Sequence, residues 1–151
     1  MSKHQSGLES IERQLRVHDL RVAALRAWRD AVVAALGKCG ESKGGRCEKA
    51  LDATPSTETL EYERDALERE IRGHEVLATL GRDRQALALL EAVAGDAALA
   101  REAAADPRAF AETRGVRLPG NMAVRVEVAG ERVSVQLDYI DRACAASLTF
   151  P

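Results

Sequence analysis

The sequence is poor in the residues that build disulfide staples and stacking surfaces. Its 151 residues include three cysteines, Cys39, Cys47 and Cys144, and this odd number fits neither a disulfide framework nor a paired metal knuckle. Aromatic residues make up only 3% of the chain, which is too few for a platform that stacks nucleic-acid bases. We therefore expect neither a disulfide-stapled fold nor a nucleic-acid partner.

Strong net charge and long apolar runs are also missing. The formal net charge is -2 although 30% of the residues are charged, so no overall field attracts nucleic acid or an anionic membrane. No apolar run approaches the roughly 20 residues that span a bilayer, and the polar opening of residues 1–14 lacks the apolar centre of a secretory signal. We expect a cytoplasmic protein without a membrane partner, and its 46% hydrophobic content is enough for a core.

Catalytic and cofactor motifs are absent from the sequence as well. No Ser-His-Asp, H-E-x-x-H, P-loop or G-x-G-x-x-G pattern occurs, and Gly44-Gly45 does not follow a strand as a phosphate-binding loop would. The sequence therefore predicts a protein that is not an enzyme and needs no cofactor.

Two long amphipathic helices are predicted in the first half of the chain. Apolar residues recur three or four positions apart over residues 8–36: Leu8, Ile11, Leu15, Val22, Leu25, Trp28, Val32 and Leu36. A glycine-rich segment, residues 37–45, favours a loop, and a short helical piece is expected at 46–51. Thr54-Pro55 indicates the start of a second helix that runs to about Leu80, so the two helices form an antiparallel hairpin.

Shorter elements follow the hairpin. Gly81 is predicted to end the second helix, and Asp83, Asp96 and Asp106 each precede a short helix as N-caps. The apolar period then changes from 3.6 to 2 over residues 124–128 and 133–139, which predicts a β-hairpin connected by residues 129–132. A two-stranded ribbon is marginal alone, so it should pack on the helices or gain a third strand from residues 140–151.

The predicted fold is mainly α with an α+β C-terminal part. Residues 1–80 form the helical hairpin, residues 81–140 a small α+β domain of short helices and a β-hairpin, and residues 141–151 a tail that is either free or an edge strand.

The segment of residues 86–139 resembles the nitrile hydratase leader peptide family, which includes the proteusin-type and azole-modified precursors. The resemblance lies in Asp-Pro-Arg-Ala-Phe at 106–110, Glu112, the Gly115 stop, Val-Arg-Leu-Pro at 116–119, and Met-Ala-Val-Arg-Val-Glu-Val at 122–128. It implies a fold like the first part of the nitrile hydratase α subunit. In such bacterial pathways the leader is recognised by a modifying enzyme, and a following core region receives the modification.

The resemblance implies recognition residues within this segment. They are Asp106, Pro107, Phe110, Gly115, Leu118, Pro119, Val124 and Val126. The implied partner is a peptide-modifying enzyme of the cyclodehydratase or lanthionine synthetase type. Two features depart from related proteins: the clustered cysteines that hold the nitrile hydratase metal are missing, and no Gly-Gly boundary follows Tyr139.

The tail carries the side chains that peptide-modifying chemistry uses. Cys144, Ser147 and Thr149 each have a β-heteroatom next to an amide, as cyclodehydration and dehydration require. The alternative is an ordinary edge strand in which Leu148 and Phe150 are buried.

Two further pairs lie in the hairpin. If the loop is centred near residue 46, residue i faces roughly residue 92 - i, which places His18 opposite His74 with Glu70 one turn away. This pair is a weak candidate for a zinc site and a somewhat better one for a pH-sensitive pair. Cys39 and Cys47 lie at the two ends of the loop, where a disulfide is geometrically feasible although free thiols are expected in a reducing cytosol.

The sequence therefore favours a non-enzymatic precursor or leader-type protein that docks to a modifying enzyme. The alternatives are a structural protein that forms a homo-oligomer through residues 8–80, because an amphipathic hairpin exposes apolar surface, and a leader-like adaptor without a modified core.

Overall fold

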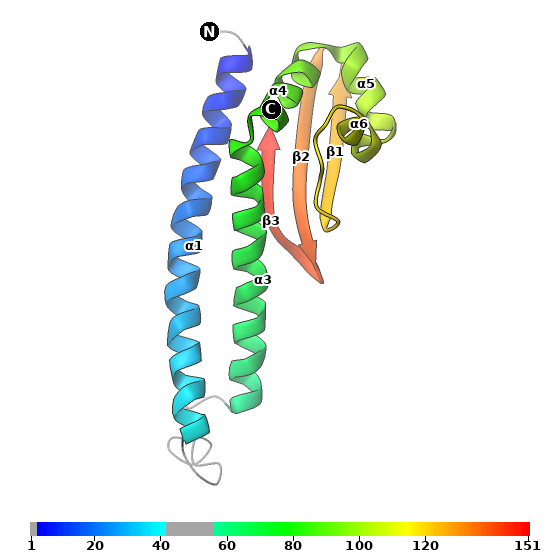
Figure 1. Cartoon of the computed structure of the whole chain (residues 1–151). Helices are drawn as coiled ribbons and strands as arrows, with labels where there is room; N and C mark the ends of the chain where they lie inside the picture. Colours follow the sequence, from blue (N-terminus) through cyan, green and yellow to red (C-terminus); the bar gives the residue numbers. More distant parts are fainter. Residues whose placement is uncertain (1–2, 42–55) are drawn as a thin grey trace.

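A long helical hairpin stands beside a three-stranded sheet with short helices (Figure 1). The computed structural model describes the backbone of residues 3–41 and 56–151 and the side chains of residues 7–38 and 56–151. The hairpin consists of α1 (Lys3–Glu41) and α3 (Thr57–Arg82). The other elements are α4 (Arg84–Gly95), α5 (Ala97–Ala105), α6 (Pro107–Thr113), β1 (Met122–Ala129), β2 (Arg132–Asp141) and β3 (Ala143–Phe150).

The two helices of the hairpin confirm the sequence prediction in type and pairing. The helical piece expected at 46–51, the Thr54-Pro55 start and a Cys39–Cys47 disulfide lie outside the described residues and side chains. Within the described residues, the N-cap of α3 is Ser56 and not Thr54, because the Ser56 hydroxyl accepts a hydrogen bond from the backbone N–H of Thr59 at 3.2 Å.

The sheet is antiparallel with the order β1-β2-β3. The predicted β-hairpin is confirmed, but its connection is shorter than expected because Ala129 pairs with Arg132. Gly130 has φ +65, a left-handed conformation that suits glycine in a two-residue turn. The tail becomes β3, the edge strand, paired with β2 through a register shift at Tyr139/Ile140.

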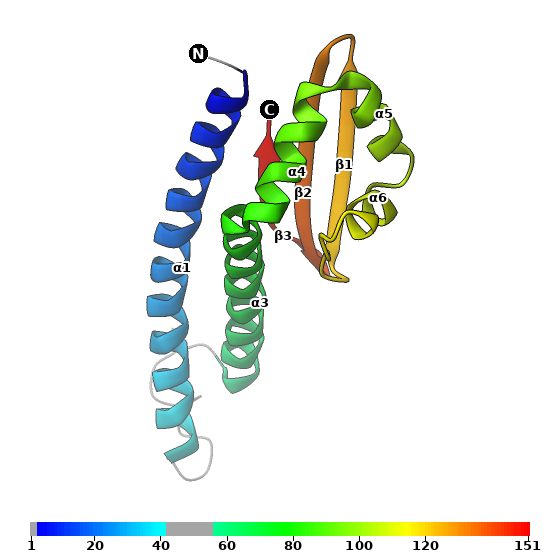
Figure 2. The ribbon, with the colours of Figure 1, turned by 45° about the horizontal axis from the view of Figure 1, so that its top comes forward.

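One face of the sheet is covered by helices and the other faces solvent. Figure 2 shows α4, α5 and α6 on the covered side, and burial alternates along β2 so that Val133, Val135, Leu137 and Tyr139 are buried. The same apolar core includes Ile11 and Leu15 of α1 together with Leu148 and Phe150 of β3. The hairpin and the C-terminal half therefore share one core.

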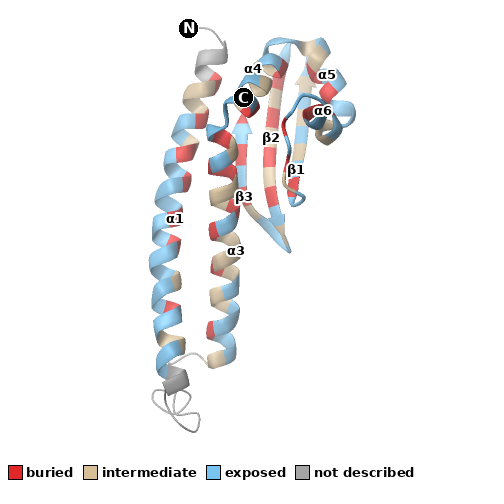
Figure 3. Ribbon diagram, in the orientation of Figure 1, coloured by how far each residue is buried: buried red, intermediate tan, exposed pale blue. Residues whose placement is uncertain are grey.

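Below the sheet the hairpin has a smaller core of its own, visible as isolated buried positions in Figure 3. It consists of Val22, Leu25, Val32, Leu60, Leu67 and Ile71. Trp28, predicted on the apolar face of the first helix, is instead 52% exposed. The reason is geometric, since 100° per residue places Trp28 about 120° from the buried Val22 around the helix, on the solvent side.

All three aspartate caps are confirmed. Asp83 accepts hydrogen bonds from the backbone of Gln85 and Ala86, and Asp96 and Asp106 begin α5 and α6 in the same way. The predicted stop at Gly81 is wrong, because α3 continues to Arg82. A Cβ on Gly81 would lie 2.8 Å from the Leu15 Cδ2, so this glycine serves the close approach of α3 to α1.

Candidate functional site

His18 and His74 lie in contact between α1 and α3, as the predicted register of the helical hairpin placed them. Their Nδ1 atoms are 2.5 Å apart, and the rings are tilted by 51° with centroids 4.7 Å apart. His18 is 6% exposed and is therefore a buried polar side chain. The pair therefore lies where its hydrogen bonds must be satisfied within the protein.

The remaining ring nitrogens also have partners. His18 Nε2 lies 3.0 Å from the Ser147 carbonyl oxygen of β3, and His74 Nε2 lies 3.7 Å from a carboxylate oxygen of Glu70. Glu70 in turn receives a hydrogen bond from Arg21 at 3.1 Å. The pair thus links α1 to α3 and β3.

Zinc is not favoured at this pair. Among the side chains that the structure describes, no group of three or more His, Cys, Asp or Glu residues is arranged to hold a metal ion. Two nitrogens bound tetrahedrally to one zinc at about 2.0–2.1 Å would also stand farther apart than 2.5 Å.

Burial lowers the pKa of both histidines below the ordinary value of 6.5. For His18, the hydrogen bond with the Ser147 carbonyl and the nearby Asp19 oppose this lowering of the pKa. For His74, the neighbouring His18 lowers the pKa further and Glu70 opposes it. Both rings therefore resist protonation more than a solvent-exposed histidine does.

Gln14 extends the same contact along β3. Its side-chain amide donates to the Thr149 carbonyl at 2.6 Å, and its amide oxygen accepts from the Thr149 N–H at 2.8 Å. Gln14 and His18 are four residues apart and lie on one face of α1, where together they bond the Ser147 carbonyl and both backbone groups of Thr149 on the outer edge of β3. Sequence reasoning missed Gln14, because a glutamine at a helix edge gives no signal of its partner.

The opposite edge of the sheet, β1, is open. Ile140 N–H donates to the Asn121 carbonyl, so Asn121 faces β2, and strand alternation turns Val124, Val126 and Val128 away from β2. Within the described part of the chain, no side chain or outside backbone group is hydrogen-bonded to the N–H and C=O groups of these three valines. We call them the open edge.

Five of the eight recognition residues implied by the resemblance line one apolar cavity beside the open edge. They are Pro107, Phe110, Leu118, Val124 and Val126. The cavity has a volume of about 60 Å³, is partly open to solvent, and is lined by apolar residues of α4, α6, β1 and β2 among others. The side chains of Phe110 and Leu118 are buried in its wall, so they shape the cavity rather than the outer surface.

The other three recognition residues fix the chain around this cavity. Asp106 caps α6, Gly115 has φ +82 after that helix, and the Pro119 carbonyl accepts a hydrogen bond from Arg108. Arg108, which sequence reasoning missed, also donates to the carbonyls of Leu118 and Met122. Its guanidinium therefore holds the loop between α6 and β1. The only sequence signal for this role is that an arginine follows the capping Asp106-Pro107.

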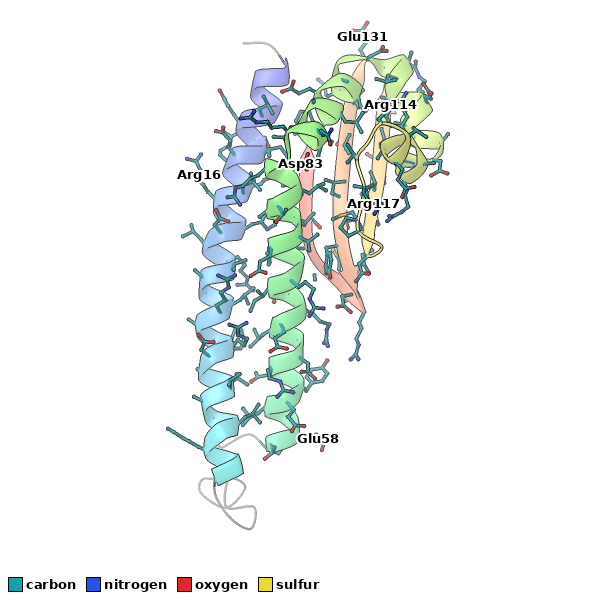
Figure 4. The ribbon with its side chains drawn as sticks, viewed as in Figure 1. Arg16, Glu58, Asp83, Arg114, Arg117 and Glu131 are labelled. Atoms are coloured by element: carbon teal, nitrogen blue, oxygen red, sulfur yellow. The ribbon has the colours of Figure 1, made fainter. Side chains whose placement is uncertain are left out.

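A second arginine covers the outside of this region. The guanidinium of Arg114 lies 3.6 Å from the centre of the Phe110 ring, and Figure 4 shows Arg114 beside α6 and Arg117 at the loop that follows. Stacking of a guanidinium on an aromatic face is a stabilising contact. Arg114 therefore covers Phe110, one of the residues that line the cavity.

Two modification candidates lie in a polar row on the solvent face of the sheet. The Cys144 thiol is 3.4 Å from the Ser147 hydroxyl, which lies 2.6 Å from Asp138, and Gln136 connects Asp138 to Arg125. Cys144 is exposed and not in a disulfide. Thr149 is also exposed, but both of its backbone groups are hydrogen-bonded to Gln14. The tail is therefore an ordered strand that is held against α1.

Comparisons with known proteins identify no relative. No family model, no curated protein and no solved structure matches this chain. A search of the described helices finds none with the length and apolar character needed to cross a membrane.

Proposed function

We propose that this chain is a non-enzymatic docking protein of the leader type, which binds a peptide-modifying enzyme through the open edge of β1. The observation that carries the proposal is the cavity. Five residues that were selected by resemblance alone line this one apolar cavity, which lies beside the backbone groups of the open edge. An exposed strand edge binds an extended segment of a partner by adding a strand, and neighbouring pockets supply specificity.

The cavity limits what the partner inserts. Its volume of about 60 Å³ exceeds the ~10–15 Å³ that a water needs and is far below the ~150 Å³ that accepts benzene. Its lining residues are all apolar, so a water would find no hydrogen-bond partner among their side chains. The partner segment should therefore carry a small aliphatic side chain opposite Val124 and Val126.

The packing of the tail favours the adaptor form of this function over the substrate form. Leu148 and Phe150 are 1% and 2% exposed, and β3 is hydrogen-bonded to β2 and α1. An enzyme that cyclises backbone amides at Cys144, Ser147 or Thr149 must first free this strand. In the adaptor form, the chain presents its edge while another peptide is modified.

The decisive experiment measures binding of the full chain to purified peptide-modifying enzymes of the cyclodehydratase and lanthionine synthetase types. Val126→Pro removes the outward N–H at an edge position where proline is tolerated, and Val126→Ala is the matched control that keeps it. We expect Val126→Pro to weaken binding at least about tenfold relative to Val126→Ala. Equal affinities, or no binding by the wild type, would refute the proposal.

Mass spectrometry of the same mixtures separates the two forms. A mass change at Cys144, Ser147 or Thr149 would support the substrate form, whereas binding without any mass change supports the adaptor form.

A second candidate function is self-association through the outward face of α1. Val17, Leu20 and Trp28 are 64%, 73% and 52% exposed on one side of this helix, where Arg16 also extends away from α3 (Figure 4). Light scattering of Leu20→Glu tests this function, with Val33→Glu as control because Val33 lies about 140° around the helix from Trp28. An oligomer lost only in Leu20→Glu would support assembly, and a wild-type monomer would exclude it.

A further inference from the structure

We propose that His18 and His74 form an acid-sensitive latch, which holds α1 against α3 and β3 at neutral pH and releases the outer edge of β3 when both rings are protonated. This inference does not depend on the enzyme partner proposed above.

The protonation states follow from the partners. His18 Nε2 faces a carbonyl oxygen, which only accepts, so this nitrogen carries a hydrogen. In neutral His18 the Nδ1 is therefore bare and accepts, and His74 must donate its Nδ1–H across the 2.5 Å contact. Neutral His74 then turns a bare Nε2 toward the carboxylate of Glu70.

Two protons have different consequences at this pair. The first proton goes to His74 Nε2, where Glu70 stabilises it and the contact between the rings survives. A second proton on His18 Nδ1 would place two N–H groups face to face and two positive charges on adjacent buried rings. The rings must then separate.

Charged groups from each packed element enter this balance. On α1, Asp19 favours a charged His18 but is already paired with Arg82 of α3 at 2.5 Å. Arg21 of α1 binds Glu70 and opposes the charge on His74, while β3 contributes the Ser147 carbonyl. The lowered pKa values of both histidines agree with a latch that is closed near neutrality.

The Thr149 amide reports the state of the latch, because its N–H is held by Gln14 one helical turn from His18. The Gln136 amide is the internal reference, since Gln136 pairs with Arg125 in the middle of the sheet. The experiment measures hydrogen exchange of both amides in the full chain at pH 7.5 and at a lower pH at which the imidazole nitrogen shifts show both rings protonated, corrected for the intrinsic effect of pH on exchange.

In the wild type, we expect protection of Thr149 to fall at least about tenfold at the lower pH while protection of Gln136 is retained. His74→Gln keeps a donor and an acceptor but cannot ionise, so its Thr149 protection should be independent of pH. Unchanged protection in the wild type, an equal fall in the variant, or a parallel fall at Gln136 would overturn the latch.

Imidazole nitrogen shifts of the wild type provide a measurement that needs no variant. The latch requires the two rings to titrate in separate steps, both below pH 6.5. Titration of both rings in one step at or above that pH would contradict it.

Discussion

The two edges of the sheet are treated in opposite ways. The outer edge of β3 is closed by side chains of α1, with Gln14 bonded to both backbone groups of Thr149 and His18 bonded to Ser147. At β1, by contrast, side-chain hydrogen bonds reach Met122 and the turn residue Gly130. Within the part of the chain that the structure describes, the backbone N–H and C=O groups of the three valines between them have no hydrogen-bond partner. An unpaired strand edge can accept a further strand, and for this reason the open edge is the side on which we propose that a partner docks.

Removing the anchor of the closed edge should have the largest effect. Phe150 is 2% exposed at the end of β3, so Phe150→Ala should destabilise the protein by about 3–5 kcal/mol through lost burial and a cavity. Urea unfolding measures this loss, and Thr149→Ala, at an exposed neighbour, is the control. Equal losses in the two variants would show that β3 is not anchored by its apolar face.

Removing the arginine that holds the loop before β1 should reduce the stability of the protein by a smaller amount. Arg108 donates to three carbonyls, at Leu118, Pro119 and Met122, so Arg108→Ala should cost about 2–3 kcal/mol. Arg108→Lys keeps the charge without the planar fork and should recover only part of this loss. If Arg108→Lys were as stable as the wild type in urea unfolding, the planar guanidinium would not be needed to bond the three carbonyls.

A larger residue at Gly73 tests how closely α3 packs against β2 and β3. A Cβ on Gly73 would lie 2.9 Å from Tyr139 Cδ1 and 3.1 Å from Ala145 Cβ. Gly73→Ala should therefore destabilise the fold by about 2 kcal/mol, although alanine is the better helix former. Among the described residues, no atom lies within 4 Å of a Cβ added at Gly37, so Gly37→Ala should stabilise the fold by about 0.5–1 kcal/mol. Thermal unfolding of the pair gives both signs, and stabilisation by both substitutions would contradict the packing.

Removing the Gln14 side chain from the outer edge of β3 should have the smallest effect on stability. Gln14→Ala removes two hydrogen bonds at an edge that water then reaches, so the loss should be about 1 kcal/mol. Hydrogen exchange at Thr149 should rise far more than this small loss implies for the whole protein. Exchange that stays slow would mean that the β3 edge is protected by something other than Gln14.

Sequence patterns predicted the local elements well because their causes are local. The aspartates at 83, 96 and 106 accept hydrogen bonds from backbone groups two or three residues away, so their caps were readable directly. The pairing of His18 with His74 was also predicted, because one loop position fixes the register of an antiparallel hairpin. Trp28 and Gly81 were misread, because the exposure of Trp28 and the use of Gly81 inside α3 both depend on how α1 and α3 pack together, which no local pattern records.

The sequence by itself determined the helical hairpin, the three capped helices and the alternating strands, because periodicity and capping act within a few residues. Tertiary structure alone decided that the tail becomes β3, that Gln14 and His18 bond its outer edge, and that five of the residues implied by the resemblance line one cavity beside β1. Contacts between Gln14 and Thr149 span 135 positions of the chain, and no local pattern specifies a partner at that distance. Only the packing of α1 against the completed sheet brings such groups together.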